Sequence, residues 1–284
     1  MRTVRKISIA LLLCAVLPLG CHKAPAPTAE VVAVKAAKLP QSPDDPAWEK
    51  VPLHLARLLP QDLVEPRLMK PSTPEVRVQA MSNGTEIAFR LSWADAQADD
   101  LPGTGRFMDG CAIQLPTKLM PEPPAPQMGQ AGGTVEITFW RADWQASVNG
   151  RADTLQELYP NASVDHYPSE AASLAPGSAD KKQMSDRYAP AQALGNRRVG
   201  PRESAVESLL AEGPGTLSPA PLNGAKGKGI RSRDGWSVVF TRPLPAGLAP
   251  GVRTQMAVAV WQGSQQESGA RKMRSGWVPL LMER

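Results

Sequence analysis

The sequence contains few of the residues that build most metal and nucleophile sites. Histidine occurs only at His22, His54 and His166, and no pair of them has the spacing of a zinc-binding motif. The chain has no Gly-x-Ser-x-Gly motif, which is the nucleophile turn of many serine hydrolases. These absences disfavour zinc-dependent chemistry and serine-based hydrolysis.

The first 20 residues have the pattern of an export signal. Three basic residues precede an apolar run, Ile7–Leu17, which is too short to be a stable membrane anchor. The run leads into Leu17-Pro-Leu-Gly-Cys21, which resembles the lipobox of bacterial lipoproteins. We therefore expect residues 1–20 to be a signal peptide and Cys21 to carry lipid on the periplasmic side of a bacterial membrane. The alternative is an ordinary cleaved signal and a soluble periplasmic protein.

Removal of this leader changes what charge and cysteine content imply. The chain has 32 Lys and Arg against 27 Asp and Glu, and three of the basic residues lie in the leader, which leaves 29 against 27, or +2. This balance gives no evidence for a nucleic-acid partner. Cys14 leaves with the leader and Cys21 would be acylated, so Cys111 has no partner for an internal disulfide.

The remaining chain has the pattern of a single all-β domain. Residues 21–40 are rich in Ala, Pro, Val and Lys, and we expect them to form a tether. Residues 41–284 would form the domain. Its clearest element is 75–93, where two alternating segments flank Asn83-Gly84, a pair that suits a tight hairpin turn. We expect a mainly β fold, namely an antiparallel β-sandwich with a few short helices and a long loop excursion.

Four other segments carry predictions of their own. Residues 144–202 lack strong periodicity, and an excursion of this length is usually functional or poorly ordered. Glu203–Glu212, which is followed by Gly213, predicts a helix. Gly224–Gly229 lacks the phosphate-loop spacing and predicts a flexible turn. Four aspartates could bind calcium, although a solvated loop fits them better; they are Asp95, Asp99, Asp100 and Asp109.

A methionine stands among prolines and glycines just before an expected strand. The segment is Pro126-Gln-Met128-Gly129, and the strand would begin near Val135. A thioether in such a loop can be a soft ligand for a metal. It can equally fill a gap in the core, as most methionines do. From these residues alone both interpretations remain open.

Several segments in the second half of the chain come in a characteristic order. They are Tyr159-Pro-Asn161, Asp165-His-Tyr-Pro168, Tyr188-Ala-Pro-Ala191, Ala211-Glu-Gly213-Pro-Gly215, Asp234-Gly-Trp236 and Ala257-Val-Ala-Val-Trp261-Gln-Gly263. The series resembles the haem b-binding subunit of ethylbenzene dehydrogenase and its relatives. Those relatives are the γ subunits of periplasmic molybdenum enzymes related to dimethyl sulfoxide reductase. The resemblance extends from about residue 44 to residue 284.

This resemblance implies one haem b, held without a covalent bond between a methionine and a lysine. The family's methionine lies in a Met-Gly loop before a strand that ends in an aromatic and Lys/Arg-Ala, as Met128-Gly129 and Phe139-Trp-Arg-Ala142 do here. The family's lysine follows a Trp-x-Gly strand, as Lys272 follows Trp261-Gln-Gly263. Met128 and Lys272 are therefore the expected axial ligands of the haem iron. No Cys-x-x-Cys-His motif is present, which excludes covalent c-type attachment.

A haem whose two axial positions are both filled by side chains leaves no iron site for a substrate. The resemblance therefore implies an exported electron-transfer protein that is not catalytic by itself. Its implied partners are an iron–sulfur subunit and a molybdenum catalytic subunit. The alternative function is a carbohydrate- or ligand-binding β-sandwich lipoprotein without haem. In that case four tryptophans could be stacking platforms, namely Trp48, Trp140, Trp144 and Trp261.

Overall fold

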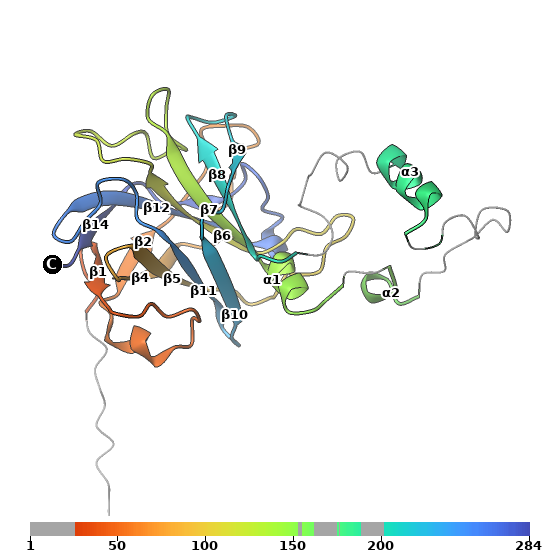
Figure 1. Ribbon diagram of the computed structural model, residues 1–284, viewed down its shortest axis with the longest axis horizontal. Coiled ribbons are helices and arrows are strands. Elements are labelled where there is room, and N and C mark those ends of the chain that lie inside the picture. The colour runs from red at the N-terminus through yellow and green to blue at the C-terminus, as the bar shows by residue number, and fades with distance from the viewer. Residues whose placement is uncertain (1–25, 153–154, 162–174, 176, 189–201) are drawn as a thin grey trace, which may run out of the picture.

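The computed structural model describes residues 26–152, 155–161, 175, 177–188 and 202–284, and the fold is mainly β. Two sheets pack against each other, as expected for a β-sandwich (Figure 1). The first sheet contains β1 (Val31–Lys35), β2 (His54–Arg57), β4 (Glu75–Ser82), β5 (Glu86–Ala94), β10 (Lys226–Arg231), β11 (Gly235–Pro243) and β14 (Val278–Met282). The second contains β3 (Leu59–Pro60), β6 (Gly110–Pro116), β7 (Val135–Arg141), β8 (Val206–Ala211), β9 (Ser218–Ala220) and β13 (Met273–Arg274).

Strand β12 (Arg253–Trp261) belongs to both sheets. Its first half, 253–256, pairs with β14, and its second half, 257–261, pairs with β6. The order is therefore continuous, β10-β11-β5-β4-β1-β14-β12-β6-β7-β8-β9. The main core lies between the sheets and includes Phe89 from the first sheet, Ile113 from the second and Val260 from β12.

The predicted hairpin is confirmed as β4 and β5. Asn83 accepts hydrogen bonds from the backbone of Thr85 and Glu86 through its side-chain oxygen. Gly84 has a φ of 91°, which a side chain would strain. The turn fixes the register, so alternate residues of β5 from Ile87 to Trp93 enter the core.

The expected tether over residues 21–40 is wrong for its second half. Residues 31–35 form β1, which lies between β4 and β14 and is parallel to both. The described fold therefore begins before residue 41, and the sandwich is mixed rather than purely antiparallel. Val31 and Ala33 are buried, whereas Lys35 is exposed. The backbone groups of β1 pair with β4 and β14, which are both distant in the sequence. Five residues are too few for alternation to be clear, so the local sequence did not predict this strand.

The helix predicted over 203–212 is also wrong, because residues 206–211 form β8. This strand pairs with β7 on one edge and with β9 on the other. Local helix propensity is a weak preference, and pairing with two strands outweighs it here. The turn predicted for the glycine-rich segment 224–229 is confirmed only at Gly224, because residues 226–229 belong to β10. A Cβ on Gly229 would lie 2.2 Å from the Trp140 ring, so glycine is needed there for close packing.

Short helices occupy the described parts of the excursion and two loops. They are η1 (Pro46–Lys50), α1 (Ala142–Val148), α2 (Leu155–Leu158), α3 (Ala179–Tyr188) and η2 (Gly263–Gln265). The excursion's first residue, Trp144, is buried in α1 with the guanidinium of Arg202 3.9 Å from its ring centre. Residues 162–174 and 189–201 of the excursion, and the leader with Cys21, lie outside the described residues.

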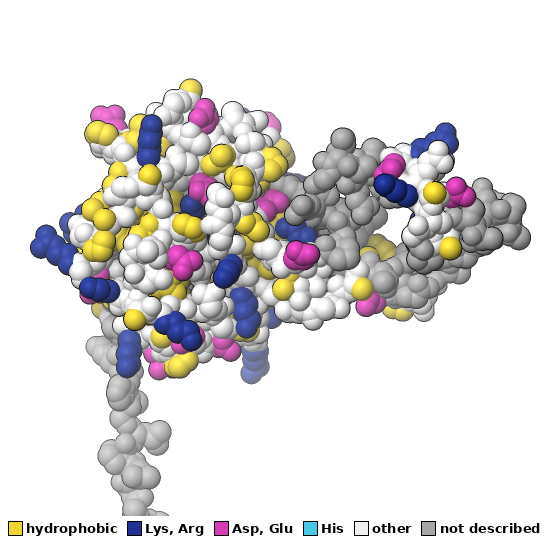
Figure 2. Space-filling model, viewed as in Figure 1, with side chains coloured by type: hydrophobic (Ala, Val, Ile, Leu, Met, Phe, Trp, Pro, Cys, Tyr) yellow, Lys and Arg dark blue, Asp and Glu magenta, His cyan; other side chains and the backbone are white. Residues whose placement is uncertain are grey.

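Acidic and basic side chains are interspersed on the face shown in Figure 2. This face has no continuous basic patch, in keeping with the near balance of charge after the leader. Among the described residues, no helix is both long and apolar enough to cross a membrane.

The role of β1 can be tested with two valines. Val31 is 1% exposed and faces the core, whereas Val32 is only partly buried on the other face. Val31→Ala should lower the free energy of unfolding by about 2 kcal/mol, from two lost methyl equivalents and a residual cavity. Val32→Ala should cost clearly less. Equal, small losses in chemical denaturation would mean that this segment is a tether after all.

Candidate functional site

A cavity of about 440 Å³ lies on the outer face of the second sheet. The alternation of strand side chains creates it. Val258 and Val260 of β12 enter the main core, whereas Ala257 and Ala259 point to the opposite face. Ala259 pairs with Ala112 of β6, so small side chains lie next to each other and leave a hollow. The volume is within the range of small-molecule and cofactor sites, about 300–1,000 Å³.

Met128 reaches this cavity from the loop before β7. It has a φ of 67°, which is uncommon for a residue with a side chain. Two hydrogen bonds hold the strained loop: Gly213 N donates to Met128 O at 2.8 Å, and Gly129 N donates to Ala125 O at 2.9 Å. Gly129 has no room for a Cβ, which would lie 2.5 Å from Gly133 O. Backbone strain of this kind is found where a side chain must be presented at a site.

Lys272 reaches the same cavity from the opposite edge, just before β13. Its Nζ lies 3.9 Å from Met128 Sδ and 5.2 Å from the centre of the Trp261 ring. The structure therefore brings together the two predicted ligands, which are 144 residues apart in sequence. A metal bound to both would need about 4.3 Å, if bond lengths are like those of zinc, about 2.0 Å to nitrogen and about 2.3 Å to sulfur. The donor set, an amine and a thioether, suits one metal ion, and the two atoms would have to move apart by about 0.4 Å to hold it between them.

Burial prepares the lysine for such a role. Desolvation, with a contribution from the positive charge of Arg274, lowers the pKa of Lys272 to about 8 from an ordinary value of 10.5. A free amine, which is the form that binds a metal, is therefore much easier to reach here than on a solvated lysine.

The cavity wall is otherwise rich in positive charge. Arg106, Arg141 and Arg274 line it together with Lys272. Arg141 is already paired with Asp143, through bonds of 2.9 and 2.8 Å. One acid, Glu267, also lines the cavity, but it is 1% exposed and burial raises its pKa. The cavity therefore suits a largely apolar ligand that also carries negative groups.

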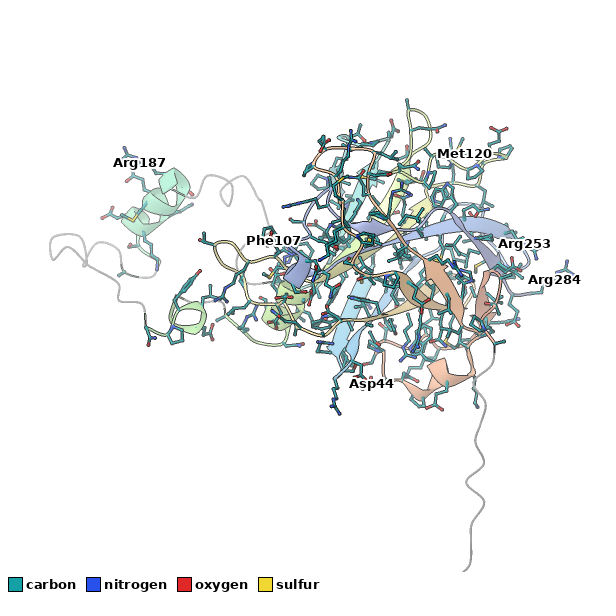
Figure 3. All side chains as sticks on the ribbon, turned by 180° about the vertical axis from the view of Figure 1, so that it is seen from behind. Asp44, Phe107, Met120, Arg187, Arg253 and Arg284 are labelled. Carbon is teal, nitrogen blue, oxygen red and sulfur yellow. The ribbon has the colours of Figure 1, made fainter. Side chains whose placement is uncertain are left out.

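The other methionines considered for the site have different positions. Met108 also lines the cavity, but the sulfur in contact with the amine of Lys272 is that of Met128. Met120 is 38% exposed and does not line the cavity. Figure 3 shows it well apart from Phe107, which does line it. Among the sulfur atoms at this site, that of Met128 faces the lysine.

The expectation of a solvated loop is wrong for two of the four aspartates, because Asp95 and Asp109 are buried, while Asp99 and Asp100 are partly exposed. Asp109 is 0% exposed and accepts hydrogen bonds from Asp99 N, Trp236 Nε1 and Gly263 N. Burial raises its pKa to about 7. Its bond to Gly263 holds the chain just after β12. No cluster that could hold a metal through His, Cys, Asp and Glu is found among the described residues.

The tryptophans do not form an exposed stacking platform. Trp48 and Trp140 are 0% exposed and Trp144 is 2% exposed, so none of the three can meet a sugar. Trp261 remains partly accessible, but its ring contacts Phe139 and lies beside the amine of Lys272. The geometry of the described tryptophans therefore does not support the carbohydrate-binding alternative.

The chain is similar in sequence to two named reductase subunits. It is 26% identical over 278 residues to a protein of Haloferax mediterranei named as a respiratory nitrate reductase heme subunit, ORF7, covering 95% of this chain and 79% of that protein. It is 24% identical over 248 residues to the chlorate reductase subunit gamma of Ideonella dechloratans, covering 84% and 78%. Among solved structures, a family 9 carbohydrate-binding module from Caldicellulosiruptor kristjanssonii in complex with glucose matches 89% of this chain and 96% of that one, with 8% identity and a TM-score of 0.44. The same module in complex with cellotriose gives 0.43, at 8% identity and with 89% and 93% covered.

The sequence model of the ethylbenzene dehydrogenase family matches residues 45–273, which include both Met128 and Lys272. Since this match spans most of the chain, the protein belongs to the ethylbenzene dehydrogenase family.

Proposed function

We propose that the protein binds one haem b without a covalent bond, with Met128 and Lys272 as the axial ligands, and transfers electrons as a subunit of a reductase complex. The observation that carries this proposal is the 3.9 Å approach of a partly buried amine and a thioether over a cavity with a floor of alanines. The family match and the names of the two relatives, a heme subunit and a chlorate reductase gamma subunit, support it.

The side chains suit electron transfer better than catalysis. Bound haem supplies a one-electron redox centre, and a methionine ligand tends to raise its potential. Met128 and Lys272 would occupy both axial positions, so no position remains for a substrate. Arg106 and Arg274 line the same cavity and would offer positive charge to the carboxylates that haem b carries; Arg274 also lies 4.0 Å from Asp62. The apolar floor of the cavity would exclude water from a haem bound there.

The finer parts of the proposal concern location and partners. The pattern of residues 1–20 and the lipobox-like segment ending at Cys21 support export and a lipid anchor on the periplasmic side of a bacterial membrane. Because the site leaves no position for substrate, the protein needs an electron donor and an acceptor. We propose an iron–sulfur subunit and a molybdenum catalytic subunit as its partners.

The ligand pair can be tested by visible spectroscopy. The wild-type protein should show the Soret band of a six-coordinate, low-spin haem. Met128→Ala should open one axial position and shift the spectrum toward high spin. Lys272→Ala removes the nitrogen donor and should weaken haem affinity at least about tenfold, or about 1.4 kcal/mol. Met120→Ala is the matched control and should change neither property. An unchanged low-spin spectrum in Met128→Ala would assign the sulfur ligand elsewhere, with Met108 the next candidate.

Haem binding by the haem-free protein should depend on pH in a defined direction. Lys272 must lose its proton to bind iron, and its pKa is lowered to about 8. Below that pH the free-amine fraction falls about tenfold per unit, so haem affinity should fall in parallel, whereas it should level off above pH 8. Lys272→Ala should lack this dependence. A flat affinity of the wild-type protein between pH 6 and 8 would contradict a lysine ligand.

The anchor and the partners can be examined in one purification. Full-length protein with a tag after Arg284, extracted in mild detergent, should be recovered from membranes with chains that contain iron–sulfur clusters and molybdenum. Cys21→Ala should leave the membrane fraction and keep its haem spectrum. An unmodified residue 21 in mass spectrometry would exclude the lipid anchor. Haem-loaded protein without any redox partner, after crosslinking in intact cells, would instead indicate a free-standing carrier.

A further inference from the structure

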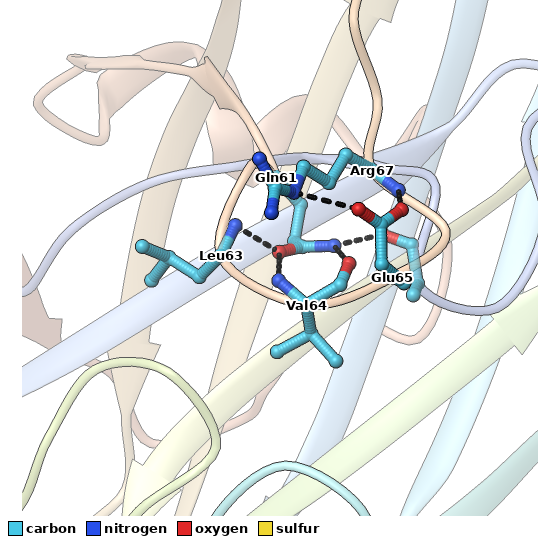
Figure 4. A network of polar contacts seen from close by, with 6 residues as sticks. Gln61, Leu63, Val64, Glu65 and Arg67 are labelled. Carbon is cyan, nitrogen blue, oxygen red and sulfur yellow. Dashed lines mark hydrogen bonds and ion pairs between the residues drawn. The ribbon is translucent and has the colours of Figure 1, made fainter.

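Gln61 occupies a special position beside the cavity, immediately after β3. It is 6% exposed, and its side-chain amide uses its full hydrogen-bonding capacity. Its oxygen accepts from Leu63 N at 2.7 Å and from Val64 N at 2.8 Å. Its nitrogen donates to Val64 O at 2.8 Å and to Ala270 O at 3.1 Å. Figure 4 shows how these bonds close the loop around the amide.

The backbone of the same residue holds the chain at Lys272. Gln61 N donates to Lys272 O at 2.9 Å, and Leu68 N donates to Gln61 O at 2.7 Å. Gln61 therefore fixes the chain on both sides of the lysine's neighbour Arg271, through Ala270 by its side chain and through Lys272 by its backbone. The bond from Leu68 N to Gln61 O also joins the first and last residues of the loop 61–68.

This loop forms one wall of the cavity with little support of its own. Leu63 and Val64 both line the cavity, yet they are 57% and 37% exposed. The Glu65–Arg67 ion pair in the loop is highly exposed, and pairs of that kind contribute little to stability. A loop with so few buried apolar contacts opens easily unless polar contacts hold it. Gln61 makes most of those contacts, and Asp62 adds a long, partly exposed ion pair with Arg274 at 4.0 Å.

We propose that Gln61 is the positioning residue of the site, which joins the Leu63–Val64 wall and the backbone of Lys272 into one rigid unit. The unit keeps the amine directed at Met128 and keeps water from entering beside it. This inference rests on the proposed function for its effect on haem, but the contacts that carry it involve the protein alone. Gln61 touches neither of the two donor atoms and acts through the segments that it holds.

The test compares substitutions at two glutamines of the full-length protein whose side-chain amides donate to backbone oxygens. Gln61→Leu keeps the approximate size and removes all four side-chain bonds. Gln79→Leu is the matched control, because Gln79 Nε2 also donates to two backbone oxygens, those of Trp48 and Val51, each at 2.8 Å, and lies away from the cavity. Haem release into an excess of a haem-scavenging apoprotein should become at least about tenfold faster in Gln61→Leu, since all four side-chain hydrogen bonds are lost. Gln79→Leu should release haem at the wild-type rate. Equal acceleration in both variants would indicate general loosening and overturn the proposal.

Gln61→Glu separates the accepting bonds of the side chain from its donating bonds. It also provides a test if the leucine variant does not fold. The carboxylate can still accept from Leu63 N and Val64 N, but it cannot donate to Ala270 O. Haem release should still be faster, because the side-chain bond to Ala270 O is lost and only the backbone bond to Lys272 O still holds the lysine segment. A wild-type rate of release in this variant would overturn the positioning role.

Amide hydrogen exchange of the haem-free protein provides an independent measurement. In Gln61→Leu the amides of residues 61, 63 and 64 should lose protection, whereas those of β5 should keep theirs. Unchanged protection at these three amides would overturn the proposal whether or not haem binds. Lost protection there, in a protein whose wild type binds no haem, would support the role of Gln61 and reject the proposed function.

Discussion

The two-sided character of β12 is the constraint on which the rest of the structure depends. The strand must complete both sheets and must also separate the core from the cavity. Val258 and Val260 fill the space between the sheets, whereas Ala257 and Ala259 leave the outer face hollow. Side chains alternate strictly along a strand, so a shift of register by one residue would exchange the two faces. The core and the cavity are thus determined by the same pairing with β6.

Loops from distant parts of the chain surround this hollow and supply its polar and sulfur-containing side chains. Met128 arrives from the loop before β7, Lys272 from the segment before β13, and Gln61 from the loop after β3. The three have no local relation, and the sheet brings them together. The strain at Met128 and the desolvation at Lys272 both cost free energy. A ligand bound by the amine would offset part of the desolvation cost at Lys272, whereas the backbone conformation of Met128 holds its side chain at the cavity.

Electrostatics divides the site into two regions. In the cavity, Lys272 and Arg274 repel each other's charge, which favours the neutral amine. Behind it, the buried carboxyl of Asp109 receives three N–H donors and holds the chain end of β12 through Gly263. Burial raises the pKa of that carboxyl to about 7, against the effect of its donors. The acidic group thus serves the framework, while the basic groups face the ligand space.

Local sequence patterns were sufficient where the structure depends on near neighbours. Alternation and the Asn83-Gly84 turn predicted the β4–β5 hairpin, because a hairpin's partner is adjacent in the chain. Alternation also failed in an understandable way. Residues 31–35 and 206–211 form strands because their backbone groups hydrogen-bond to strands that are distant in the sequence. A short window of sequence does not contain those partners. The same is true of Gly229, whose small size is explained by the ring of Trp140 and by nothing nearby in sequence.

The sequence by itself determined the class of the fold and, through a family resemblance, two residues to examine, Met128 and Lys272. It did not determine that these side chains meet, because they are 144 residues apart in the sequence and reach the cavity from opposite edges. It gave no signal for Gln61, whose role depends on the carbonyls that lie within reach of its amide. It also did not distinguish the alanines of the cavity floor from small core residues. Only the tertiary structure decided these points, since the desolvation of an amine, the opening of a cavity and the saturation of an amide are properties of what packs around a residue.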